Sequence, residues 1–173
     1  MMTLRSPCSA LKAPMQRMAQ EWRDHGDDRY RSVLEDFEAY LAEVRRFEDA
    51  ATVPPEWVRC TEFCLEAGGE IVGCSRLRFE LNARLELEGG HIGYDVRPSM
   101  RRRGFGKSLL RLVLVEARRA GLERVLVTAD ADNEPSLRII ERNGGVFAGE
   151  AVSMKSGKSV RRYWLDLQGG TAP

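Results

Sequence analysis

The chain has 173 residues, of which 43% are hydrophobic and 31% charged, the composition of one ordinary globular domain. Its formal net charge is only +1 at pH 7, which argues against nucleic acid or an acidic membrane surface as a partner. The sequence contains no apolar stretch typical of a signal peptide or a membrane-spanning helix. The four cysteines include no C-x-x-C pair, so we expect a cytoplasmic protein with reduced thiols and no metal site.

From the N-terminus, residues 3–7 favour a short strand, and residues 11–26 and 29–50 favour two helices. The second helix is predicted from apolar residues at three- and four-residue spacing, among them Val33, Phe37, Leu41 and Val44. Residues 57–67 and 70–81 flank the diglycine at 68–69, which predicts a hairpin. Residues 82–90 form a connector of undetermined shape.

The second half of the chain alternates strands and helices. Residues 91–96 and 122–129 read as strands on either side of a helix at 104–120, a crossover unit with parallel strands. A short capped helix at 133–145 and a hairpin of residues 146–152 and 160–167 follow. The predicted fold is a single α/β domain over residues 1–173, with a mixed central sheet flanked by helices and two N-terminal helices before the main strands.

The segment "RPSMRRRGFGKSLL" at 97–110 joins a strand to a helix and is rich in arginine and glycine. A P-loop requires glycine at 101, which is arginine, and a dinucleotide-binding fingerprint requires glycine at 109, which is leucine. What remains is R-x-x-G-x-G, formed by Arg101, Gly104 and Gly106. Backbone N–H groups at such a helix start favour an anion, and a diphosphate fits. The alternative is a basic helix start that is merely solvated.

These residues, together with "NEPSLRIIERNGGVF" at 133–147, resemble the acetyl-CoA-binding core of the GNAT superfamily of N-acetyltransferases. The matching positions, in order, are Val96, Pro98, Arg101, Gly104, Gly106, Asn133, Ser136, Gly144 and Phe147. The core covers about residues 91–147. Most of the remaining chain is similar to a bacterial subgroup of largely uncharacterised predicted acetyltransferases, so the resemblance extends over nearly all of the sequence.

The resemblance implies acetyl-CoA as co-substrate. Backbone N–H groups between Arg102 and Ser108 would hold the diphosphate, and the strand around Val96 would pair with the pantetheine arm and offer an N–H to the thioester oxygen. Asn133 and Ser136 would contact the arm from the other side, although Asn133 is also read as a simple helix N-cap. The expected cofactor-binding residues are Val96, Arg101, Arg102, Arg103, Gly104, Phe105, Gly106, Lys107, Ser108, Asn133 and Ser136.

The catalytic groups are less clear, because many relatives carry a glutamate on the strand before the V-x-P segment and residues 91–96 contain none. His91 and Asp95 share one face of that strand and Tyr94 lies on the other. We favour His91 as general base, since an unperturbed imidazole has a pKa of about 6.5; a hydrogen-bonded structural histidine is the alternative. The tyrosine that relatives use to protonate the thiolate is Ile140 here. Tyr94, Tyr163 or solvent serves instead, or the thiolate leaves unassisted.

The resemblance therefore predicts an acetyl-CoA-dependent N-acetyltransferase that acts on a primary amine by direct attack. A coenzyme A-binding sensor with little turnover is the alternative. The acceptor is expected to be a small-molecule or peptide amine, and the acidic N-terminal helices favour a cationic one. Arg76, Arg78 and Asn82 would instead orient an anionic acceptor, unless they are only solvated. Edge strands in the C-terminal hairpin allow a homodimer.

Overall fold

The structure, a computed structural model, describes residues 1–168; residues 169–173 lie outside the described part of the predicted domain. A seven-stranded sheet with the order β1-β2-β3-β4-β5-β7-β6 forms its centre. The strands are β1 (Met2–Arg5), β2 (Cys60–Ala67), β3 (Glu70–Arg78), β4 (Ile92–Val96), β5 (Arg124–Asp130), β6 (Val146–Val152) and β7 (Ser159–Asp166). Only β4 and β5 are parallel; every other neighbouring pair is antiparallel. The predicted mixed sheet flanked by helices is confirmed.

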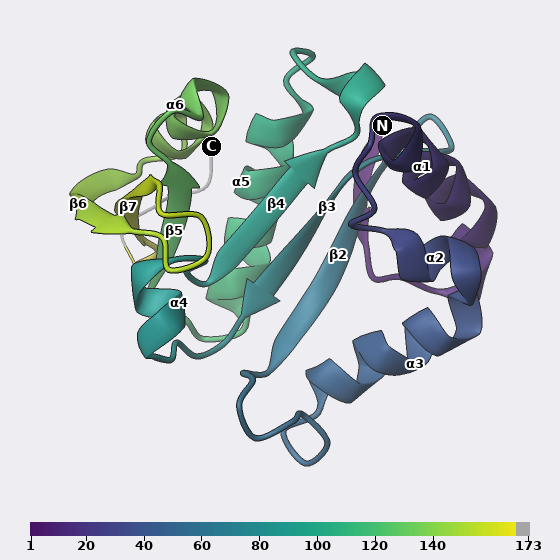
Figure 1. Cartoon of the computed structure of the whole chain (residues 1–173), viewed down its shortest axis with the longest axis horizontal. Coiled ribbons are helices and arrows are strands. Elements are labelled where there is room, and N and C mark those ends of the chain that lie inside the picture. Colours follow the sequence, from purple (N-terminus) through teal and green to yellow (C-terminus); the bar gives the residue numbers. More distant parts are fainter. Residues whose placement is uncertain (169–173) are drawn as a thin grey trace.

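Helices cover both faces of the sheet. They are α1 (Lys12–Asp24), α2 (Arg31–Glu35), α3 (Phe37–Glu48), α4 (Ala83–Leu87), α5 (Phe105–Arg119) and α6 (Glu134–Arg142). Figure 1 shows α1, α2 and α3 against the β2–β3 half of the sheet, and α5 behind it on the opposite face. The connector at 82–90, whose shape the sequence left open, contains α4, which begins where the Asn82 side chain accepts a hydrogen bond from the Leu85 N–H.

The second predicted N-terminal helix is not continuous. Asp36 has an extended backbone, with φ of −151°, and separates α2 from α3. Its carboxylate accepts hydrogen bonds from the N–H groups of Glu38 and Ala39, so it caps the start of α3. The apolar spacing continues across this break, and for that reason the periodicity alone predicts one helix. The capping preference of aspartate decides the local structure.

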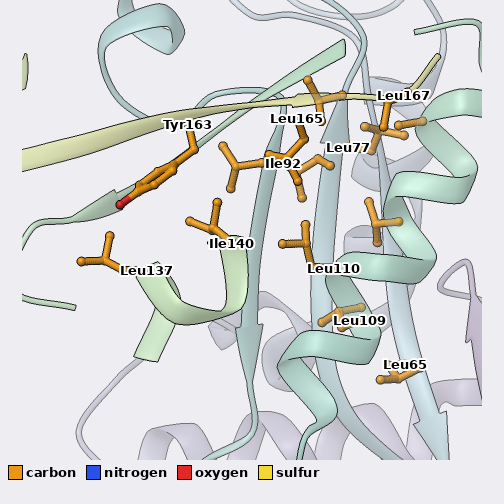
Figure 2. Close-up of a cluster of buried hydrophobic side chains, with 14 of the residues drawn as sticks. Leu65, Leu77, Ile92, Leu109, Leu110, Leu137, Ile140, Tyr163, Leu165 and Leu167 are labelled. Carbon is orange, nitrogen blue, oxygen red and sulfur yellow. The ribbon is translucent and has the colours of Figure 1, made fainter. Parts of the chain in front are cut away.

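Two apolar cores lie on the two faces of the sheet. Alternate residues of β2 and β3 point in opposite directions: Leu65 and Leu77 pack with α5 and α6, whereas Cys64 and Cys74 pack with α1 and α3. Figure 2 shows the first core, in which Leu110 of α5 lies near Ile92 of the sheet and Leu109 lies closer to Leu65. This core fixes α5, and with it the glycine-rich turn, against β4.

All four cysteines are free, and Cys60, Cys64 and Cys74 are buried, where a free cysteine packs as a small apolar side chain. The Cys64 and Cys74 sulfurs lie 3.3 Å apart across the β2–β3 pair. Among residues 1–168, no helix combines the length and the apolar character that a membrane crossing requires.

Candidate active site

The parallel strands β4 and β5 pair only near the start of β4. Their ladder is confined to Ile92 and Val127, whereas β4 pairs with β3 all the way from Ile92 to Val96. Figure 1 shows the C-terminal end of β4 directed away from β5. Beyond Ile92, the edge of β4 that faces β5 therefore has no strand partner, so it can hydrogen-bond an extended ligand in place of a strand.

The arginine-rich turn ends at the N-terminus of α5, next to this opening. Gly104 is the N-cap of α5, with φ of +84°, and no side chain caps the helix. The first helical hydrogen bond runs from the Ser108 N–H to the Gly104 carbonyl. The N–H groups before Ser108 therefore have no acceptor within the helix, and no acidic residue occupies the first turn. An uncapped helix start of this kind is a ready site for an anion.

Two positions show that the turn is built for close approach. Arg102 has φ of +58° and is the only non-glycine residue with positive φ among the described residues; backbone turns with left-handed residues form anion-binding concavities of N–H groups. Gly106 is buried, and a Cβ atom there would lie 2.8 Å from Ile139 Cδ1 and 3.3 Å from Val96 Cγ2. The absence of a side chain at Gly106 therefore lets α5 start directly against β4 and α6.

The basic side chains around the turn are exposed, and none forms a salt bridge within residues 1–168. Arg101 places its guanidinium 5.0 Å from the Trp22 ring centre and donates to the Val96 carbonyl at 3.3 Å. Arg103 lies over the Phe105 ring at 5.4 Å. Because none of them is held in a salt bridge within the described residues, Arg101, Arg102, Arg103 and Lys107 supply a positive field to any anion held at the helix start.

Glu21 of α1 holds the segment that leads into this turn, a contact that sequence reasoning missed. Its carboxylate accepts from the Ser99 N–H at 2.7 Å and from Arg97 Nε at 2.5 Å; Arg97 also bonds Glu70 of β3 at 2.9 Å. Burial alone would raise the pKa of Glu21, but the hydrogen bonds that its carboxylate accepts from Ser99 and Arg97 outweigh this effect and lower the pKa. The only sequence signal was the position of Glu21 beside Trp22 in a predicted amphipathic helix.

Asn133 is the N-cap of α6, as one reading of the sequence proposed. Its Oδ1 accepts a hydrogen bond of 3.3 Å from the Ser136 N–H. Both residues lie across the β4–β5 opening from Tyr94, whose hydroxyl is 3.4 Å from the Ser136 carbonyl. The cap leaves the Asn133 amide nitrogen and the Ser136 hydroxyl without a partner among the described residues, so a role for both in binding the pantetheine arm stays a prediction.

His91 sits at the closed end of the opening. Its ring Nδ1 accepts a hydrogen bond of 2.9 Å from the Leu126 N–H, while its backbone N–H donates to the Leu126 carbonyl at 2.7 Å. Burial, with the nearby charges of Arg78 and Arg124, lowers the pKa of His91 to about 4. The Nδ1 lone pair, which a base would need, is thus engaged in joining β4 to β5. This geometry favours the structural reading of His91 that the sequence left as the alternative.

Asp95 lies further along β4, on the face covered by α1 and α2. Its Oδ2 accepts a hydrogen bond of 2.7 Å from the Tyr30 hydroxyl and lies 3.5 Å from the Arg29 guanidinium. Its Oδ1 is buried and has no hydrogen-bond partner within residues 1–168. Burial raises the pKa of Asp95, and the opposing effects of Tyr30 and Arg29 do not cancel it. A carboxylate with a raised pKa and a free oxygen is suited to accept a proton.

The tyrosines predicted as proton donors occupy different environments. Tyr94 reaches across the β4–β5 opening, and burial raises its pKa to about 12. Tyr163 is buried in the core and donates to Glu141 at 3.1 Å; Figure 2 shows its hydroxyl pointing away from Ile92, with the ring near Ile140. Ile140 is itself fully buried in this core. Of the two tyrosines, only Tyr94 lies at the opening.

A sequence profile described as "Acetyltransferase (GNAT) family" matches residues 18–145, which is most of the chain. The chain belongs to the GNAT family of acetyltransferases. It is therefore an acyltransferase that uses acetyl-CoA as co-substrate, and the resemblance noted from Val96, Arg101, Gly104, Gly106 and Asn133 is confirmed as to family. A search of curated protein sequences finds no match.

Solved GNAT structures share this fold. Mycobacterium smegmatis RimJ, solved with a CoA disulfide, aligns with a TM-score of 0.73 and 18% identity over 95% of this chain and 81% of that one. The structure of yncA from Salmonella typhimurium with its cofactor acetyl-CoA aligns with a TM-score of 0.65 and 19% identity, over 99% of this chain and 97% of that one. A chimera of spermidine N-acetyltransferase SpeG from Vibrio cholerae and hSSAT aligns with a TM-score of 0.67 and 18% identity, over 96% of this chain and 95% of that one.

Proposed function

We propose that this GNAT enzyme transfers the acetyl group of acetyl-CoA to an amine of a small molecule or peptide, by direct attack and with Asp95 as general base. The observation that carries the proposal is the buried, unpartnered Oδ1 of Asp95 on the strand that borders the β4–β5 opening. Trp22 Nε1 is also buried without a partner in the described part of the chain. A buried polar atom without a partner, such as Asp95 Oδ1, is expected where a polar ligand completes a site.

The chain's own residues divide the remaining tasks. The N–H groups at the start of α5, with Arg101, Arg102, Arg103 and Lys107, would hold the diphosphate, and the free edge of β4 near Val96 would position the thioester and offer an N–H to its oxygen. Phe105, Gly106 and Ser108 form the first turn of α5, and Asn133 and Ser136 would face the arm from α6.

Protons are balanced in the following way. The amine nitrogen forms a bond to the thioester carbon, and Asp95 accepts the proton that the nitrogen then loses. The C–S bond breaks, and the thiolate leaves as an anion that takes a proton from solvent. A thiol pKa of about 8.5 makes this departure easy. Tyr94 has a pKa of about 12, so it would keep its proton and donate a hydrogen bond to the departing sulfur in place of its 3.4 Å contact with the Ser136 carbonyl.

The decisive experiment measures thiol release from acetyl-CoA with a panel of amines, with mass spectrometry to detect the acetylated product. Turnover with at least one amine, lost in Asp95→Asn, is expected. A coenzyme A-binding sensor, the alternative class, would bind CoA tightly and release no thiol with any amine.

The cellular location and the oligomeric state can also be predicted. The four free cysteines favour a cytoplasmic location. For a homodimer, β6 is the available strand, because it is the edge of the sheet and carries exposed Val146 and Val152; β7, the other strand of the predicted C-terminal hairpin, is paired on both sides.

A further inference from the structure

A small pocket, partly open to solvent, lies at the far end of β2 and β3 from the glycine-rich turn. Arg76 and Arg78 of β3 and Arg84 of α4 line it. Phe47 at the end of α3 and Trp57 in the following loop also contribute to its lining. Figure 1 shows α3 and α4 on either side of these strand ends. None of these residues belongs to the coenzyme A-binding motif.

Arg78 is a cation without a counterion. Its NH1 donates to the carbonyls of Gly89 at 3.2 Å and Gly90 at 3.0 Å, and it forms no salt bridge within residues 1–168. Burial, together with the like charges of Arg76 and Arg84, lowers the pKa of Arg78 to about 10. A half-buried guanidinium with two other guanidinium groups nearby is electrostatically unsatisfied, and an anion in the pocket would relieve this.

The charges around Arg78 leave a net positive pocket. Arg76 is paired with Glu62, whose carboxylate also accepts from the Tyr40 hydroxyl at 2.8 Å. Arg84 has no carboxylate partner among the described residues and lies 5.4 Å from the Trp57 ring centre. Of the three arginines, only Arg76 forms a salt bridge within residues 1–168, so Arg78 and Arg84 remain available to a ligand.

The pocket also offers an apolar wall. The Trp57 side chain is 50% exposed, and its ring packs edge-on against Phe47 with centroids 5.7 Å apart. An exposed tryptophan held in place by a second aromatic ring provides a rigid surface for the carbon skeleton of a bound molecule.

The pocket shares its face of the sheet with Asp95. Arg78 lies on the same side of β3 as Cys74, which pairs with Asp95. A Cβ atom on Gly93 of β4 would lie 3.9 Å from Arg78 NH1, so the guanidinium extends over β4 itself. Gly93 and Asp95 are two residues apart along a strand, a distance of about 7 Å. An acceptor whose amine lies at Asp95 can therefore place a second group at Arg78.

We propose that the acceptor of this enzyme is an amine that also carries a carboxylate, such as an amino acid or a short peptide acid, and that Arg78 and Arg84 bind this carboxylate. The inference rests on the proposed acetyl transfer at Asp95 and names the class of its substrate. Arg78 and Arg84 are binding residues that select the acceptor, whereas Asp95 takes the proton.

The ion pairs of the N-terminal helices argue against a polycationic acceptor. The acids of α1 and its neighbours that suggested one are mostly paired: Glu21 with Arg97, Asp27 with Arg29, and Asp28 with Arg23. Asp36 is used as a helix cap. The helices therefore present few free carboxylates to the acceptor side, while the lining of the pocket presents arginines.

The test compares amines that differ only in their second group. γ-Aminobutyrate, ε-aminocaproate and ω-aminooctanoate are each assayed beside the corresponding carboxamide, and spermidine is included as a polycation. We expect the best ω-amino acid to exceed its carboxamide at least about tenfold in kcat/KM, since hydrogen bonds between charged groups are worth at least that factor. Arg78→Met and Arg84→Met should each raise KM for the carboxylate and leave KM for the carboxamide unchanged. Arg119→Met, at an exposed arginine on α5, should change neither.

Three results would overturn the inference without contradicting acetyl transfer itself. They are equal rates for carboxylate and carboxamide, a preference for spermidine, and an Arg78→Met defect that is the same for both compounds. If no amine is acetylated, the proposed function fails, and calorimetric titration of ε-aminocaproate into the CoA complex still decides the pocket. Binding that weakens in both Arg78→Met and Arg84→Met supports the carboxylate site, and absence of binding to the unsubstituted protein contradicts it.

Discussion

The Tyr30 hydroxyl donates a hydrogen bond of 2.7 Å to Oδ2 of Asp95 and so joins the loop between α1 and α2 to strand β4. The bond fixes the carboxylate with Oδ2 occupied and leaves Oδ1 buried and free. The N-terminal helices therefore do more than cover the sheet: they orient the group that we assign as the base.

Replacement of Asp95 by asparagine is expected to lower kcat about 10²- to 10⁴-fold, the usual contribution of a general base. Asparagine keeps an oxygen for Tyr30 but cannot accept a proton. Steady-state rates at saturating acetyl-CoA measure the loss, and calorimetry should show unchanged CoA affinity. Asp24→Asn, at an exposed residue whose carboxylate accepts a hydrogen bond from Gln20, is the matched control. An Asp95→Asn enzyme with normal kcat would remove Asp95 from the mechanism.

Replacement of Tyr30 by phenylalanine should move the pH profile without abolishing activity. The hydrogen bond from Tyr30 opposes the effect of burial on the pKa of Asp95, so its loss raises that pKa further. The acidic limb of kcat/KM is then expected at higher pH, with the plateau at high pH retained. Tyr40→Phe removes a similar hydroxyl, bonded to Glu62, and should leave the limb in place; a shift in both variants or in neither would argue against the assignment.

Replacement of Gly104 by alanine should weaken CoA binding, because Gly104 caps α5 with φ of +84°. A left-handed conformation costs an alanine about 1–2 kcal/mol, and relief of this strain would turn the N–H groups away from the diphosphate. Gly121, with φ of +87° and no atom within 4 Å of the place a Cβ would occupy, is the control at the other end of the helix. Both variants should lose similar stability in urea titrations, but only Gly104→Ala should lose affinity for CoA, roughly tenfold. Equal CoA affinity in the two variants would contradict a backbone site.

The contact of Glu21 with Ser99 and Arg97 should make stability sensitive to acid. Folding lowers the pKa of Glu21 from its ordinary value of 4.5, so its stabilising effect is complete above that pH and disappears as the pH falls through the lower, folded-state pKa. Glu21→Gln should therefore melt at a lower temperature than the unsubstituted protein at pH 7, and the difference should shrink below pH 4.5. A melting-temperature difference that is constant with pH would show that the charge is irrelevant.

Most of the fold is predictable from local sequence, because its strands and helices carry clear periodicity and the glycine-rich turn at 104–106 has a fixed spacing. The interruption at Asp36 is not predictable in this way, because the Asp36 side chain caps α3 although the apolar pattern continues through this position. In the candidate site, the spacing predicts a glycine-rich turn before a helix, and the family resemblance is what suggests a role for it in binding. The environments of His91 and Asp95 could not be predicted. Leu126, which bonds His91, and Tyr30, which bonds Asp95, are both distant from them in sequence.

The pairing of charges in the fold differs from what the sequence suggests. Acidic residues between Glu21 and Asp36 suggest a negative surface in the sequence, yet their partners Arg97 and Arg29 neutralise them in the fold. Arg78 has no such partner in residues 1–168, and nothing in the sequence distinguishes it from Arg76, which does.

The sharpest test is a crystal structure of the protein with bound acetyl-CoA. We expect the diphosphate on the backbone N–H groups between Arg102 and Ser108, and the thioester in the opening between β4 and β5, within reach of Asp95 Oδ1. A diphosphate bound elsewhere, or a thioester on the far side of β4 from Asp95, would refute the proposed site.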